Sequence, residues 1–125
     1  MEIVKKELTP TVVKLSFGAQ LDDAGAGVKG SVELDIENQG LFIETIHNIL
    51  QDGKQNIVLD MSGITYIDSS GLWALFEGHK KVTQKSLKMV IFGVTKDVRR
   101  VLDITKMSSK LTLVESEKEA LAHFG

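Results

Sequence analysis

The sequence contains no cysteine, which excludes a disulfide framework, a thiol nucleophile and a thiolate metal site. Apolar runs are short, and none approaches the length that spans a bilayer. The first ten residues, MEIVKKELTP, are charged from the second position and do not resemble a signal peptide. With 15 basic and 17 acidic residues, the chain also lacks the excess of Lys and Arg that a nucleic-acid-binding surface needs. We therefore expect an intracellular protein that binds no nucleic acid and has no direct membrane contact except through a partner.

What is present is the composition of an ordinary globular domain. The chain has 125 residues, of which 42 % are hydrophobic and 26 % are charged. A chain of this length can bury a hydrophobic core without disulfides or metals. Residues 1–125 are therefore predicted to form a single domain.

Residues 57–76, IVLDMSGITYIDSSGLWALF, form the stretch around which the rest of the chain is predicted to be arranged. Residues 57–59 are an apolar, mostly β-branched run, which is typical of a strand buried on both faces. Ser62-Gly63 interrupts this run, and residues 64–67 resume it. Beyond Asp68, apolar positions recur at helical spacing, which predicts an amphipathic helix packed on the sheet. These positions are Leu72, Leu75, Phe76, His79 and Val82.

Polar and small residues stand where this strand region meets the helix. Asp68 suits the N-cap position, which places Ser69 and Ser70 in the first turn with their hydroxyls toward solvent. The open N–H groups and the positive dipole end of a helix start favour added negative charge. Gly71 removes a side chain at this point, so that it either admits another backbone or only relieves crowding in the turn.

The first half of the chain is predicted to supply a hairpin, a strand and a helix. Strands at residues 3–4 and 12–17, with a turn at 9–11, indicate an antiparallel N-terminal hairpin. Residues 31–36 alternate as a strand does. A helix over residues 39–51 follows, capped by Asp35 or Asn38, ended by Asp52-Gly53 and apolar along one stripe.

The second half continues with alternating strands and helices. Residues 88–94 are predicted to form a buried strand, and Thr95 to Asp97 cap a short helix. Residues 110–114 alternate as an edge strand does, and Ser116 to Glu119 fit a capping box for a terminal helix. The fold class is therefore α/β: a mixed, mostly parallel sheet entered by an antiparallel hairpin, with helices packed mainly on one face.

Few residues could carry enzyme chemistry. His47, His79 and His123 fall on three different predicted helices without metal-ligand spacing, and His79 is expected to be a half-buried structural residue. No G-x-S-x-G elbow activates Ser69 or Ser70. The acidic residues Asp22, Asp23 and Asp35 lack the spacing of a calcium loop. We predict a protein that is not an enzyme and that uses no cofactor or metal.

A phosphoryl group on Ser70 would act on a partner more than on the fold. It would add roughly −1.5 to −2 charge at a surface helix start. The helix N-terminus would favour this anion, whereas the Asp68 carboxylate would repel it. A docked partner would have to desolvate the new dianion, so the switch would operate by charge and shape at an interface.

The sequence resembles a known family. Residues 57–72 (IVLDMSGITYIDSSGL) resemble the signature of the STAS domain, a family named for sulfate transporters and anti-sigma factor antagonists. The resemblance continues over residues 34–124, through Leu34-Asp35, Asp52-Gly53, residues 88–94 (KMVIFGV) and residues 98–105 (VRRVLDIT).

The resemblance implies a bacterial, cytoplasmic anti-sigma factor antagonist that is switched by phosphorylation. In its unphosphorylated form such a protein binds an anti-sigma factor serine kinase and releases a sigma factor, and a serine phosphatase restores that form. The family motif assigns the phosphate to Ser70, with Ser69 as the second candidate, and the switch loop to residues 68–71. Asp35, Leu72 and Trp73 are implied as partner contacts.

Two departures from the family pattern leave alternatives open. Residues 18–30 are glycine-rich and look like a loop insertion, which either changes partner choice or is a neutral surface feature. Trp73 is large for its position, and it serves either as a binding anchor or as a flank of the core. An alternative function is a STAS scaffold subunit of a stress-signalling assembly or an accessory subunit of a membrane transporter. The sequence leaves the oligomeric state open between a monomer and a weak dimer.

Overall fold

The computed structural model describes residues 2–18, 32–53 and 55–124. The predicted loop insertion therefore lies, except for Gly18, outside the described residues. The helices and strands, in chain order, are β1 (Glu2–Thr9), β2 (Val12–Gly18), β3 (Val32–Leu34), α1 (Gln39–Asp52), β4 (Asn56–Asp60), β5 (Ile64–Ile67), α2 (Ser69–Gln84), β6 (Met89–Phe92), α3 (Lys96–Ile104), the 3-10 helix η1 (Met107–Ser109), β7 (Thr112–Leu113) and α4 (Glu117–Ala122).

The main sheet has five strands in the order β1-β2-β4-β6-β7. The strands β1 and β2 form the predicted antiparallel hairpin, and the pairs β2-β4, β4-β6 and β6-β7 are parallel. The apolar strand β4 lies at the centre, with Ile57, Val58 and Leu59 fully buried. The mixed, mostly parallel sheet is confirmed, and so is the place of β7 at its edge.

The strand β5 does not continue β4 in the main sheet. It pairs in parallel with β3 in a separate two-stranded sheet. A turn causes the separation: Asp60 Oδ1 accepts hydrogen bonds from the Ser62 backbone N–H at 2.9 Å and from its hydroxyl at 2.7 Å. The Ile64 N–H then bonds to the Met61 carbonyl at 2.9 Å, which closes the turn and redirects the chain.

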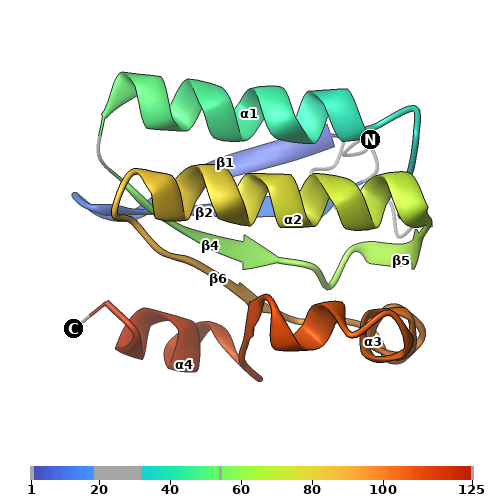
Figure 1. Cartoon of the computed structure of the whole chain (residues 1–125). Helices are drawn as coiled ribbons and strands as arrows, with labels where there is room; N and C mark the ends of the chain where they lie inside the picture. Colours follow the sequence, from blue (N-terminus) through green and yellow to red (C-terminus); the bar gives the residue numbers. More distant parts are fainter. Residues whose placement is uncertain (1, 19–31, 54, 125) are drawn as a thin grey trace, which may run out of the picture.

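The helices cover the two faces of the main sheet unequally. The helices α1 and α2 run side by side over one face, and β4 and β6 run between α2 and the short α4 (Figure 1). Buried side chains of α1, α2 and α3 join one large core with the strands, whereas α4 adds only Ala120 to a small cluster with Val12, Val58 and Val90. Packing mainly on one face, as predicted, is confirmed.

The buried face of α2 differs in part from the predicted stripe. Leu72, Leu75 and Val82 are buried and His79 is half-buried, as expected, but Phe76 is only half-buried. Ala74 and Gly78, which lie outside the predicted stripe, are buried as well. The reason is the neighbouring helix: a Cβ atom on Gly78 would lie 3.0 Å from the Phe42 ring of α1, so α2 buries a face toward α1 as well as toward the sheet.

Local capping agrees with the sequence at two of the later helices. Thr95 Oγ1 accepts from the Val98 N–H at the start of α3, and Ser116 Oγ accepts from the Glu119 N–H at the start of α4. The capping box of α4 is incomplete, because Glu119 Oε2 accepts from the Glu115 N–H instead of the Ser116 N–H. A search of the described residues found no helix with the length and apolarity of a membrane span.

Candidate functional site

The start of α2 is built by Asp68. Its backbone is extended, and its Oδ1 accepts a hydrogen bond from the Gly71 N–H at 2.9 Å, as an N-cap does. The Asp68 N–H itself donates to the carbonyl of Leu34 at 3.3 Å. This second bond ties the start of α2 to the end of β3. The predicted cap is therefore present, and it is anchored to a strand that lies 34 positions earlier in the chain.

Gly71 is in close contact with the same strand end. A Cβ atom at this position would lie 2.1 Å from the Leu34 carbonyl oxygen and 2.7 Å from Ile67 Cγ1. Both distances are far shorter than any van der Waals contact. Of the two roles considered for Gly71, the structure supports the close approach of another backbone.

Asp35 follows Leu34 and shapes the turn that leads into α1. Its Oδ1 accepts hydrogen bonds from the N–H groups of Glu37 at 3.0 Å and Asn38 at 3.2 Å. Asn38 is the N-cap residue of α1, but its side chain makes no capping bond and donates to the Glu33 carbonyl at 2.5 Å. Asp35 therefore lies next to the start of α2 and organises the neighbouring turn.

The two serines differ in exposure. Ser69 is exposed, whereas Ser70 is half-buried, so the expectation that both hydroxyls face solvent holds fully only for Ser69. Gly71 and Leu72, which follow directly, are buried, so this side of the first helical turn faces the core. The Ser70 hydroxyl makes no hydrogen bond to another residue in the described part of the chain.

The residues that the resemblance implied as partner contacts separate into buried and exposed ones. Leu72 is 8 % exposed and packs in the core, which leaves little of its side chain for a partner in this conformation. Trp73 is 52 % exposed, so it stands on the surface instead of flanking the core. Two further apolar side chains that the sequence reading missed are exposed near the serines, Ile36 at 68 % and Tyr66 at 48 %.

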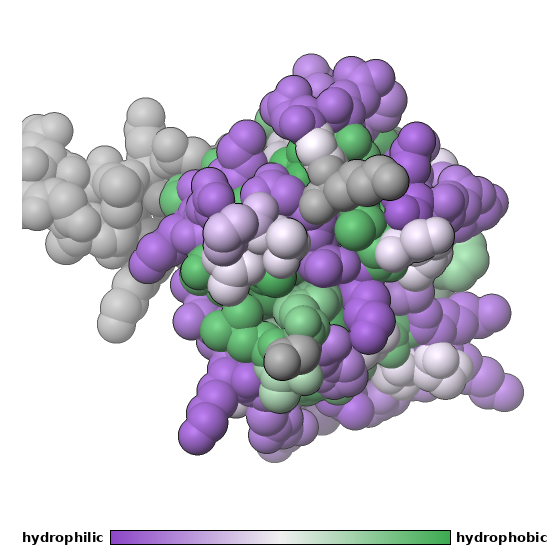
Figure 2. Space-filling view, turned by 90° about the vertical axis from the view of Figure 1, so that its left-hand side faces the viewer, coloured by the Kyte–Doolittle hydropathy of each residue, from purple (hydrophilic) through white to green (hydrophobic). Residues whose placement is uncertain are grey.

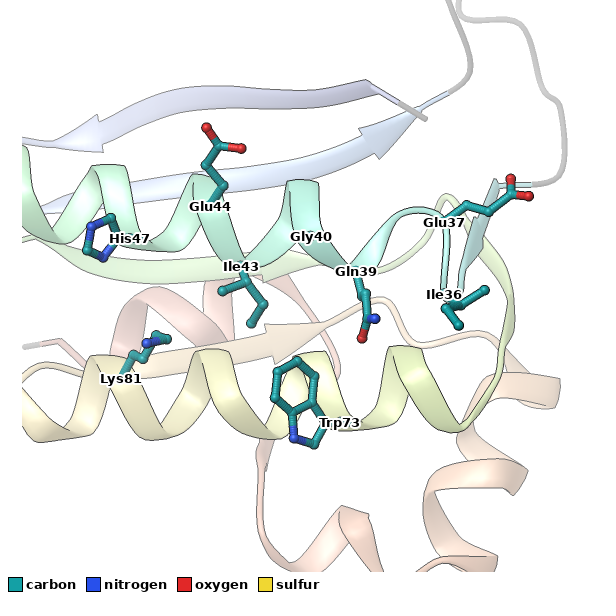
Figure 3. Close-up of a pocket in the computed structure, with 9 residues that line it drawn as sticks. All are labelled: Ile36, Glu37, Gln39, Gly40, Ile43, Glu44, His47, Trp73 and Lys81. Carbon is teal, nitrogen blue, oxygen red and sulfur yellow. The ribbon is translucent and has the colours of Figure 1, made fainter.

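A groove of about 540 Å³ runs along the surface between the packed helices α1 and α2, and Trp73 is one of its lining residues. Figure 3 shows that Trp73 and Ile43 point toward each other from the two helices, with Ile36 and Gln39 at the end where α2 begins. The groove depends on which faces of the two helices meet, and only the exposed Trp73 hinted at it in the sequence.

The histidines remain apart from this site's serines. His79 is half-buried on α2, and desolvation by burial lowers its pKa below the ordinary value of 6.5. His47 and His123 are exposed, as predicted. Among the described residues, no three His, Asp or Glu side chains are grouped so that they could hold a metal ion.

Comparison with known proteins places the chain in a family. Residues 28–120 match the family model of the STAS domain, which is most of the chain. The chain therefore belongs to the STAS domain family.

Two relatives with curated names agree with this assignment. The chain is 30 % identical over 95 residues to an anti-sigma F factor antagonist of Paenibacillus polymyxa, covering 75 % of this chain and 81 % of the relative. It is 27 % identical over 103 residues to an anti-sigma-B factor antagonist of Staphylococcus aureus strain NCTC 8325, covering 82 % of this chain and 95 % of the relative.

Solved structures share the fold at low sequence identity. An anti-sigma factor antagonist from Mycobacterium paratuberculosis superposes with a TM-score of 0.75 at 18 % identity, covering 98 % of this chain and 92 % of the other. The Bacillus cell fate determinant SpoIIAA in its phosphorylated form superposes with a TM-score of 0.67 at 14 % identity, covering 99 % and 100 % of the two chains.

Proposed function

We propose that this protein is an anti-sigma factor antagonist, a cytoplasmic binding protein and not an enzyme. Its membership of the STAS domain family and its similarity to two proteins that carry this name support the proposal. In its unphosphorylated form it binds an anti-sigma factor serine kinase and so releases a sigma factor. Phosphorylation of Ser70 ends this binding, and a serine phosphatase restores it.

The observation that carries the proposal is the state of the first turn of α2. Asp68 and Gly71 are both committed to the fold, the first as a cap and the second by its contact with Leu34. The Ser70 hydroxyl between them has no hydrogen-bond partner among the described side chains and backbone groups. A phosphoryl group on Ser70 would therefore replace no internal bond, and it would lie at a helix N-terminus, which favours anions.

The surroundings of Ser70 suit a protein interface. Ile36 and Trp73 are exposed and line one groove beside the start of α2. Tyr66 is exposed on β5, where it lines a separate hollow with Val98 and Val101 of α3. Aromatic residues of this kind are frequent anchors in protein interfaces. A partner seated on them would have to desolvate a charge of roughly −1.5 to −2 once Ser70 is phosphorylated. Asp35 contributes by holding the turn that carries Ile36.

The test is a phosphosite map. The purified protein and its Ser70→Ala and Ser69→Ala variants are incubated with ATP and a lysate of the bacterium that encodes the chain, and phosphate is located by mass spectrometry. We expect one phosphate on the wild type and on Ser69→Ala, located at Ser70, and none on Ser70→Ala. The kinase retained by an immobilised Ser70→Ala protein should be lost from a Ser70→Glu protein.

Other outcomes would change the proposal in defined ways. A phosphate on Ser69 that survives Ser70→Ala would move the switch to the more exposed serine. No phosphate on any variant, while an established STAS antagonist is labelled in the same lysate, would favour the alternative of a scaffold subunit or a transporter accessory subunit.

A further inference from the structure

The groove that contains Trp73 extends along both helices. A second hollow of about 390 Å³ is lined by residues nearer the ends of α1 and α2, and it shares His47 and Lys81 with the first. The two hollows therefore form one continuous groove, which we call the α1–α2 groove. The second hollow is also lined by Leu50, Gln51, Gln84 and Lys85.

Charges of opposite sign lie at opposite ends of the α1–α2 groove. Glu37 lies where the helices begin, and Lys81 and Lys85 lie on the half where they end. Glu44 is near the middle of α1 and points away from α2 (Figure 3). Figure 3 shows Glu37 at one side of Trp73 and Lys81 with His47 at the other. Figure 2 views the molecule from the end where α1 and α2 finish, and it shows hydrophilic side chains around a hydrophobic patch in the lower part of that face.

Gly40 leaves a notch in the wall of this groove. Apart from atoms of its own helix turn, no heavy atom of the described chain would lie within 4 Å of a Cβ atom at this position. The fold therefore has no need of glycine at this position, although glycine weakens a helix relative to alanine. The notch lies opposite Trp73 across the groove, and it has room for a side chain from outside.

We propose that the α1–α2 groove binds an amphipathic helix of a protein partner, aligned antiparallel to α1 and α2. A groove between two packed helices accepts a third helix through apolar side chains at i, i+3, i+4 and i+7. A helix commonly carries acidic residues in its first turn and basic residues in its last turn. Only the antiparallel orientation places these ends against Lys81 and Lys85 and against Glu37, respectively.

The groove shares Ile36 and Trp73 with the surface that the proposed switch controls, but its basic half consists of other residues and lies apart from Ser70. From Ser70 to Lys81 the helix α2 rises by about 16 Å, so the basic half of the groove is more than a Debye length from the serine at physiological salt. We therefore expect the contacts of the partner helix with Lys81 and Lys85 to be little affected by a phosphate on Ser70.

The probe is a pair of synthetic 16-residue amphipathic peptides with the same apolar stripe. The first peptide has Glu in its first turn and Lys in its last turn. The second peptide has these charges exchanged. Trp73 is the only tryptophan of the chain, so its fluorescence reports groove binding directly. We expect the first peptide to bind wild-type protein at least tenfold more tightly than the second. The double variant Glu37→Gln/Lys81→Glu leaves no net charge at either end of the groove, so it should abolish this preference. The helicity of each peptide is the same with both proteins, so it cancels when the two proteins are compared.

Two control variants separate groove binding from general effects. Lys80→Glu changes a neighbouring lysine that lines neither hollow, and it should leave both affinities within twofold. Gly40→Gln fills the notch with a helix-favouring residue, and it should weaken the first peptide at least tenfold while the melting temperature stays the same or rises. Equal affinity for both peptides, or no change of Trp73 emission at millimolar peptide, would overturn the proposal. Either result would leave the phosphosite map of Ser70 unaffected.

Discussion

The helices α1 and α2 lie side by side on one face of the sheet, yet their first turns are built differently. The first turn of α2 is capped by Asp68 and packed through Gly71 against the backbone of β3. The first turn of α1 has no capping bond from the Asn38 side chain, and around Gly40 it has open space. The two glycines therefore serve opposite purposes, close packing within the fold in one case and space at the surface in the other.

This difference indicates how the two helices divide their roles. A helix start that is held by a cap and by backbone contact keeps its geometry when charge is added beside it. The open start of α1, in contrast, leaves room for side chains of a partner. The proposed switch therefore lies on α2, and α1 contributes to the proposed binding groove beside it.

The largest expected effect is that of Gly71→Ala. Its Cβ atom would lie 2.1 Å from the Leu34 carbonyl oxygen, so β3 and α2 would have to separate. We expect a loss of at least about 3 kcal/mol in the free energy of unfolding, measured by urea denaturation, which exceeds the gain in helix propensity of about 1 kcal/mol. The matched variant Gly40→Ala should leave stability unchanged or raise it. Equal effects at both glycines would remove the contrast between the two helix starts.

A smaller loss is expected when Asp68 is replaced by Ala. This change removes the cap from the Gly71 N–H and should lower the free energy of unfolding by about 1–2 kcal/mol. Asn38→Ala, at the equivalent position of α1, removes no capping bond but only the exposed side-chain hydrogen bond to the Glu33 carbonyl, and it should cost less. The measurement is again urea denaturation, and an equal or larger loss for Asn38→Ala would show that the start of α1 is the more tightly held of the two.

The half-buried His79 on α2 should make the stability of the protein depend on pH. Burial lowers the pKa of His79 below 6.5, so the unfolded chain takes up a proton first as the pH falls. The stability contributed by neutral His79 is complete above pH 6.5 and declines as the pH falls below it, until the folded protein is protonated as well. In urea denaturation at pH 7.5 and 5.5, the wild type should lose more stability on acidification than His79→Gln. Identical pH dependence in the two proteins would contradict this account.

Ser70→Ala should have the smallest effect on the isolated protein. The hydroxyl has no hydrogen bond to other described residues, so its removal should change the free energy of unfolding by no more than about 0.5 kcal/mol. Thermal and urea denaturation should both show this. A loss comparable to that of Asp68→Ala would mean that Ser70 belongs to the cap, and the serine would then be an unsuitable site for a switch that spares the fold.

Much of the fold could be predicted from the sequence, since the signals are local. The hairpin follows from two strands around a Thr-Pro-Thr turn, and the cap of α2 follows from Asp68 before a run at helical spacing. The burial of β4 follows from the apolar run at residues 57–59. In each case a few neighbouring residues are sufficient for the prediction, because turns, caps and strand burial depend on short-range geometry and composition.

The candidate site could be predicted only in part. The sequence indicated the serines and the cap, but it did not indicate Ile36 or Tyr66, which are single apolar residues among polar neighbours. It also placed Leu72 at the partner surface, where the structure has a side chain that is 8 % exposed. A helical stripe predicts which residues share a face, but it does not predict how many neighbouring elements cover that face.

By itself, then, the sequence determined the order of the elements, the buried centre of the sheet and the chemistry of the α2 start, because these depend on contacts between residues near in the chain. Only the tertiary structure decided that β5 leaves the main sheet to pair with β3, and that the Leu34 backbone comes to rest on Gly71. It alone decided that Trp73, Ile43 and Lys81 line one groove. The physical reason is that strand pairing and surface grooves form where segments distant in the sequence meet. How these segments fit together depends on the packing of the whole core.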